Sequence, residues 1–128
     1  ETFYASLVGH SVPTYCTAGG RAALSVMPDA EARGIVERTP IHAYTSKTLT
    51  DVDEIMMQIS HAREQGYAVI VEEFVQGEVA IGVPISSGGH PLGAIHVAGS
   101  LSEWTPEAFV DRVAPLASEA ARAIVVSL

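Results

Sequence analysis

The sequence predicts an α+β domain in which helices pack on a mainly antiparallel sheet. The stretch 66–100 is typical of three consecutive strands, and the last two are separated by a turn that holds Gly88 and Gly89. Helical patterns lie before and after this stretch and do not alternate with the strands, which is the arrangement of an α+β fold. The chain has 128 residues, the length of one domain.

The second of these strands has two unlike faces. Residues of one parity are β-branched and residues of the other are small or polar: Val79, Ile81, Val83 and Ile85 against Glu78, Ala80, Gly82 and Pro84. On the returning strand, His96 and Ala98 fall on one face, opposite Ile95 and Val97. A face of small residues leaves volume beside the sheet. Either a closely docked helix or a cavity for a small molecule can fill that volume.

The N-terminal third predicts a strand and two helices. Thr2–Val8 has a β-rich composition, and Thr17 is placed to cap a helix over Ala18–Val26. Gly19 and Gly20 lower the helix propensity of its first turn by about 1 kcal/mol each, so either a closely approaching sheet or ligand favours them, or the loop is simply flexible there. A second helix is expected from Pro28 to Arg38.

The remaining helices have clear start signals. After an irregular surface crossing over 41–50, Thr50 is predicted to cap a helix that ends at Gly66, with a buried stripe at Val52, Ile55, Met56, Ile59 and Ala62. Thr105 and Pro106 begin a long terminal helix. Its predicted buried stripe is Phe109, Val113, Leu116, Ala117, Ala120 and Ile124.

The charge balance argues against nucleic-acid binding by this chain. The net charge is −8, and Lys47 is the one lysine. Phosphate neutralisation needs a face rich in Lys and Arg. No window is apolar over the roughly 20 residues of a membrane span, so a cytoplasmic protein without membrane partners is expected. Because the chain starts at Glu1, it is expected to be a piece of a longer protein.

Catalytic and metal-site patterns are weak. Cys16, His96 and Glu72 could serve as nucleophile, base and orienting group, but no nucleophile-elbow motif surrounds the cysteine. Glu72 and Glu73 are adjacent in a predicted strand, so they should point to opposite faces and not form a catalytic pair. The histidines are scattered along the sequence, so they could form a metal site only if the fold brought two of them together. The prediction is a non-enzyme with no cofactor and no metal.

Three segments together resemble one family. TYCTAGGRAALS, starting at Thr14, resembles the helix-opening motif of IclR-type bacterial transcription regulators, an aromatic residue or His and a small residue followed by Thr/Ser-Ala-x-Gly-Lys-Ala. GYAVIVEEFVQGEVAIGVPI resembles the family's Gly-Tyr segment, its paired acids, and its strand ending in Pro. HPLGAIHVAGS resembles its last strand. The order and spacing of all three agree with the family.

The resemblance implies a GAF-like, or profilin-like, effector-binding domain over residues 1–128. In that family this domain follows an N-terminal winged helix-turn-helix, which this chain lacks. It binds a small metabolite in a cavity over the sheet and forms homodimers or tetramers that space the DNA-binding domains. DNA would therefore be a partner only through the missing domain. A sensor module of the same fold in another signalling protein is the alternative.

The family's effector-binding positions carry over one at a time. They fall on Tyr4, Ala18, Gly19, Ile70, Glu78, Ala80, His96 and Ala98. Backbone N–H groups at the helix start would receive a ligand carboxylate.

Several of these positions depart from the family pattern. The family often has Asp where Ile70 stands, Cys where Ala80 stands, and Ser where His96 and Ala98 stand. We expect a larger, apolar or aromatic effector, with His96 as its polar anchor, Tyr4 stacking on it and Glu78 at the mouth. A pocket that has lost its ligand is the other interpretation.

Overall fold

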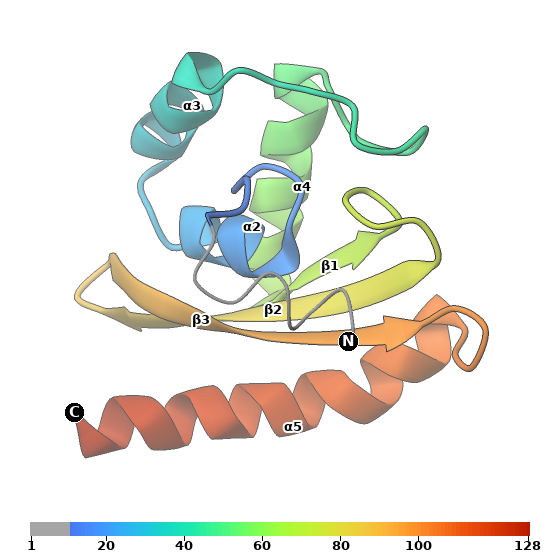
Figure 1. Cartoon of the computed structure of the whole chain (residues 1–128). Helices are drawn as coiled ribbons and strands as arrows, with labels where there is room; N and C mark the ends of the chain where they lie inside the picture. The colour runs from blue at the N-terminus through green and yellow to red at the C-terminus, as the bar shows by residue number, and fades with distance from the viewer. Residues whose placement is uncertain (1–10) are drawn as a thin grey trace.

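The computed structural model describes residues 11–128, and these form three layers, with the sheet between one long helix and a group of three (Figure 1). The predicted strand Thr2–Val8 lies outside the described residues. The elements are α2 (Ala18–Ser25), α3 (Asp29–Arg38), α4 (Val52–Gln65), β1 (Ala68–Val71), β2 (Glu78–Ser87), β3 (His90–Ser100) and α5 (Pro106–Ser127). The predicted α+β class is confirmed.

The described strands form an antiparallel sheet in the order β1-β2-β3. Gly88 and Gly89 occupy the β2–β3 turn with φ values of 58° and 80°, a conformation that glycine adopts without steric penalty. Cross-strand pairing sets Ala80 opposite both Ile70 and Ala98, and Gly82 opposite His96. The small residues predicted for one face therefore form rows across the sheet.

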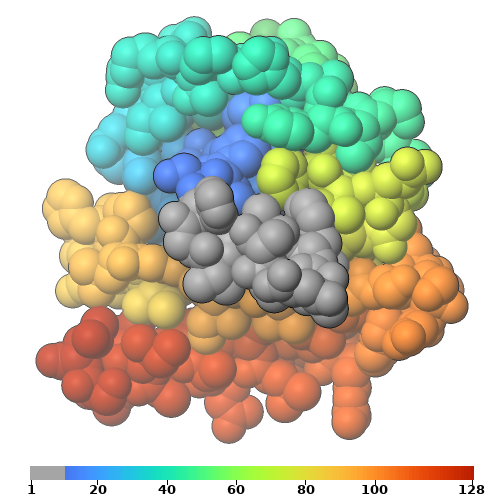
Figure 2. Space-filling view, in the orientation of Figure 1, coloured from blue at the N-terminus to red at the C-terminus, as the bar shows by residue number. Residues whose placement is uncertain are grey.

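The β-branched face of the sheet packs against α5, which runs along it (Figure 1). In space-filling form, α5 fills one whole side of the molecule next to β3 (Figure 2). The predicted stripe of this helix is wrong at Leu116, Ala120 and Ile124, which are exposed. The bulky sheet residues leave little depth, so alanines turn inward instead. The buried helix residues are Phe109, Ala114, Ala117 and Ala121.

The opposite face of the sheet receives α2. A Cβ placed on Gly82 would lie 2.1 Å from the carbonyl oxygen of Ala18, so the helix backbone rests directly on the strand backbone. At this position a docked helix therefore fills the space beside the small-residue face, which is one of the two interpretations of that face. Helices α3 and α4 lie outside α2 (Figure 1) and bury a second apolar cluster with it. Its members are Tyr15, Cys16, Leu24, Ala32, Val36, Ile55, Met56 and Ile59.

Helix ends follow the capping chemistry of the sequence with one correction. Thr17 and Thr105 accept backbone N–H groups as expected, from Gly20 at 3.3 Å and Ala108 at 3.1 Å. The cap of α4 is Asp51, which accepts the Glu54 N–H at 3.0 Å, and not Thr50. A carboxylate at this place also faces the positive end of the helix dipole, which favours Asp over Thr.

The segment 41–50 is irregular, as predicted, but it is attached to the core and does not merely cross the surface. The Tyr15 hydroxyl donates to the His42 carbonyl at 2.9 Å and accepts from the His42 N–H at 2.8 Å. The Thr48 hydroxyl donates to the Glu73 carbonyl at 2.6 Å. These bonds hold the segment against the stretch that precedes α2 and against the loop that follows β1.

Candidate functional site: a cavity between helix α2 and the sheet

A cavity of about 480 Å³ lies beside the point where α2 touches the sheet. Both interpretations of the small-residue face therefore apply, because the helix covers Gly82 and the cavity takes the neighbouring space. Six of the predicted effector-binding residues line it: Ala18, Gly19, Ile70, Glu78, Ala80 and His96. Gly19 and His96, which are 77 positions apart in the sequence, meet in one wall.

One predicted residue does not line the cavity, and another lies outside the described residues. Ala98 packs against the cluster of Ala18, Ile70 and Ala80, next to the cavity but not lining it. Tyr4 lies outside the described residues.

The structure adds cavity residues that sequence reasoning missed. Phe74 and Val75 follow the acid pair, and Ala94 shares the strand parity of His96, which was a usable signal. Ala23 lies one helical turn after Gly19 and lines the same space. Val12 had no signal, because it lies in an irregular stretch whose position depends on tertiary contacts.

The start of α2 and His96 are joined by a hydrogen bond. The Gly19 N–H donates to Nδ1 of His96 at 3.2 Å, and the Gly20 N–H donates to the Thr17 hydroxyl at 3.3 Å. A carboxylate that bound these N–H groups, as the sequence suggested, would have to displace both acceptors. The helix start thus orients His96 in the cavity wall.

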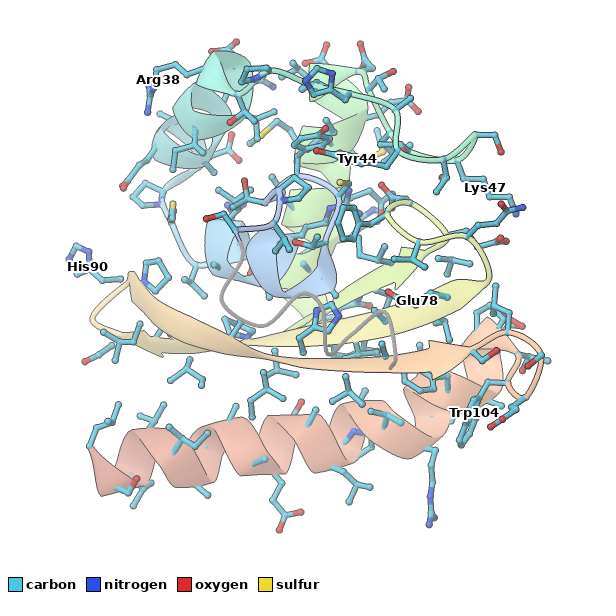
Figure 3. The ribbon with its side chains drawn as sticks, in the orientation of Figure 1. Arg38, Tyr44, Lys47, Glu78, His90 and Trp104 are labelled. Carbon is cyan, nitrogen blue, oxygen red and sulfur yellow. The ribbon has the colours of Figure 1, made fainter. Side chains whose placement is uncertain are left out.

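Among the described residues, Glu78 and His96 provide the ionisable groups of the wall. Glu78 is 7% exposed, so its side chain is buried, and it lies on the side of the sheet that faces α2 (Figure 3). Desolvation lowers the pKa of His96, and the negative charge of Glu78 opposes this shift without cancelling it. His96 is therefore neutral at neutral pH, with its proton on Nε2 because Nδ1 accepts a hydrogen bond.

This pKa shift predicts a pH dependence of stability. Since the folded state holds the His96 pKa below the unfolded value of about 6.5, the unfolded chain takes up its proton first on acidification. The contribution is complete above about pH 6.5 and is lost as the pH falls toward the folded-state pKa. Urea unfolding from pH 8 to pH 5 should show a smaller loss for His96→Asn, whose Oδ1 can still accept the Gly19 N–H but does not titrate. Identical pH profiles for the two proteins would contradict this assignment.

A buried ion pair joins two of the segments that form the cavity wall. Arg21, which is 1% exposed, donates from Nη1 and Nη2 to the two carboxylate oxygens of Glu73 at 2.9 and 2.8 Å. Nη2 also donates to the Tyr15 carbonyl. The pair ties α2 to the loop that carries Phe74 and Val75. Sequence reasoning missed this role, although Arg21 takes the motif's basic position and Glu73 belongs to its acid pair.

The acid pair does not lie in a strand, as the sequence suggested. β1 ends at Val71, and Glu72 adopts a left-handed φ of 59°. The two carboxylates still diverge: Glu72 accepts from the Gly77 N–H at 3.0 Å and from Lys47 Nζ at 3.0 Å, which together lower its pKa. The left-handed residue ends the strand and turns Glu73 inward toward Arg21.

Cys16 is not an activated nucleophile. Its side chain is fully buried, and desolvation together with the nearby Glu73 raises the pKa of its thiol to about 12. Within residues 11–128, no group of three or more His, Cys, Asp or Glu could hold a metal ion. Across the same residues, no helix has both the length and the apolar character needed to cross a membrane.

Comparison with known proteins shows which family shares this sequence and fold. The family model for the C-terminal domain of the bacterial transcriptional regulator IclR matches residues 2–126. The Pca regulon regulatory protein of Pseudomonas putida is 34% identical over 116 residues, which is 90% of this chain and 40% of that protein. The chain thus spans about 40% of the length of this curated relative.

Solved structures share the fold. The C-terminal domain of the Escherichia coli transcriptional regulator KdgR has a TM-score of 0.80 and 27% identity, covering 89% of this chain and 70% of that one. The inducer-binding domain of PobR from Acinetobacter, a double mutant solved with 3-hydroxybenzoic acid, has a TM-score of 0.83 and 24% identity, covering 91% and 67%. These relatives are named as regulators and not as enzymes. The chain belongs to the family of IclR-type bacterial transcriptional regulators and corresponds to their C-terminal domain.

Proposed function

We propose that this domain senses a small apolar or aromatic molecule in the cavity between α2 and the sheet. The observation that carries the proposal is the cavity itself: its volume of about 480 Å³ falls within the range of small-molecule sites, and its wall is mainly apolar with a few polar groups. Six residues at the family's effector positions line it. The aromatic compound in the PobR structure supports the idea that this fold can house such a ligand.

We also propose that the domain acts within a longer regulator. DNA contact would come from a separate N-terminal winged helix-turn-helix, since the chain itself carries a net charge of −8. Ligand binding would shift a homodimer or tetramer toward one quaternary arrangement, and thereby change the spacing of the DNA-binding domains. Exposed apolar side chains of α5, such as Leu116 at 59% and Val126 at 87%, support self-association.

Thermal unfolding against a ligand panel tests the proposal. At about 100 times its dissociation constant, a true effector should stabilise the domain by about 2.7 kcal/mol, which is several degrees for a domain of this size. Ala23→Phe, which places a ring in the cavity from α2, should abolish this shift. Ala30→Phe, at an exposed position in the first turn of α3, is the matched control and should retain it. Equal shifts in the two variants would show that the ligand binds elsewhere.

A further inference from the structure

We propose that Phe74 selects an aromatic effector over a saturated one by packing its ring against the ring of the ligand, and that Tyr44 is its positioning residue. This inference rests on the proposed function, namely that the cavity beside α2 is the effector site, and it decides between an aromatic ligand and one that is only apolar. Phe74 is not among the effector positions that the family resemblance supplies. Sequence reasoning gave the stacking role to Tyr4, which lies outside the described residues.

Phe74 gives the cavity wall its one phenyl ring among the described residues. The other side chains that line the cavity are aliphatic, small or polar, apart from the imidazole of His96. That imidazole is already engaged at Nδ1 by the Gly19 N–H. Phe74 is only partly buried, so part of its ring remains accessible from the cavity. A flat ligand ring can therefore meet Phe74 in an offset-stacked or edge-to-face arrangement, which adds affinity beyond the apolar area that it buries.

Tyr44 contacts the Phe74 ring from outside the cavity wall. The two rings pack edge to face, with centroids 5.1 Å apart and planes at 71°. Tyr44 does not line the cavity, and it is 48% exposed. The contact therefore fixes the orientation of the Phe74 ring from one side and leaves the side toward the cavity for a ligand.

One hydroxyl ties together the backbones on which these two rings stand. Thr48 Oγ1 accepts the Tyr44 N–H at 3.0 Å and donates at 2.6 Å to the carbonyl of Glu73, the residue before Phe74. The Glu73 carboxylate is bound in turn by Arg21 of α2. Phe74 is thus held in the wall before any ligand arrives, so little ordering of this ring opposes binding.

The test compares ligands that differ only in ring saturation, with calorimetry on the 128-residue chain. Naphthoate is paired with its decahydro derivative, and phenylacetate with cyclohexylacetate. The head group is the same within each pair, so its contribution cancels from the ratio of the two affinities. On the unmodified chain we expect the aromatic member to bind about 3- to 10-fold more tightly, which is the range of one aromatic pair.

Substitutions then show whether this preference comes from Phe74. Phe74→Leu keeps an apolar side chain without a ring and should bring the two affinities close together. Tyr44→Leu should narrow the ratio as well, whereas Tyr44→Phe, which keeps the ring, should preserve it. Tyr67→Leu is the matched control and should leave the ratio unchanged, because this partly buried aromatic residue packs on the α5 side of the sheet. A general loosening of the fold would weaken both members of a pair and leave their ratio as it was.

The outcomes separate this inference from the proposed function. A saturated ligand that binds the unmodified chain as tightly as its aromatic counterpart overturns the role of Phe74, while the cavity remains the effector site. The same holds if Phe74→Leu keeps the full preference. The comparison on the unmodified chain stands even if Phe74→Leu fails to fold. If no member of either pair binds, or if binding survives Ala23→Phe, the cavity is not the effector site and both proposals fall.

Discussion

Replacing Arg21 with methionine should lower the free energy of unfolding by about 3–5 kcal/mol, because it leaves the Glu73 carboxylate buried without a counter-charge. The guanidinium is 1% exposed and donates to both oxygens of Glu73. Methionine fills most of the volume of the aliphatic stem, so the loss reports mainly the charge. Denaturant unfolding at neutral pH measures it.

The partner of Arg21 supplies the matched test. The double variant Arg21→Met, Glu73→Leu removes both charges and should recover most of the lost stability, since an apolar pair often replaces a buried ion pair at little cost. Arg33→Met is the control: its pair with Asp53 is solvent-exposed and should contribute no more than about 1 kcal/mol. If Arg21→Met and Arg33→Met lower the free energy of unfolding equally, the buried pair of Arg21 with Glu73 does not stabilise the fold more than an exposed ion pair does.

The Arg21→Met variant should also weaken effector binding. Arg21 ties α2 to the loop that carries Phe74 and Val75, and both of these residues line the cavity. Loosening this contact leaves the ligand to order the wall on binding, which reduces affinity.

The second large effect is expected at Gly82. A Cβ there would lie 2.1 Å from the Ala18 carbonyl oxygen and 2.8 Å from the Gly19 nitrogen, both of them backbone atoms that cannot rotate away. Gly82→Val must therefore lift α2 from the sheet, and we expect a loss of about 3 kcal/mol or more. Since α2 also forms one wall of the cavity, ligand-induced thermal stabilisation should disappear in any fraction that still folds.

Gly93→Ala is the control for this substitution. Gly93 also lies in a strand, but a Cβ built on it meets no atom of residues 11–128 within 4 Å, so alanine should be tolerated with little change in stability. Circular dichroism during thermal unfolding of the two variants makes the comparison. Comparable midpoints for Gly82→Val and Gly93→Ala would contradict the close approach of α2 to β2.

Local patterns were sufficient for much of this fold. Strand parity separated Val79 and Ile81, which pack on α5, from Ala80 and Gly82, which face α2. Start signals located α2 and α5, because caps and prolines act within one turn of the helix. The terminal helix shows the limit of such patterns: Leu116 fits a helical stripe, yet the sheet rotates alanines inward and leaves it 59% exposed.

The sequence by itself determined the α+β class, the strand order along the chain, the small-residue face and six of the residues that line the cavity. Only the tertiary structure decided that α2 rests on Gly82, that Arg21 and Glu73 pair behind the cavity, and that His96 accepts the Gly19 N–H. The physical reason is distance along the chain. Periodicity and capping depend on neighbours a few residues away, whereas these contacts join residues 52 to 77 positions apart and exist only after the layers have packed.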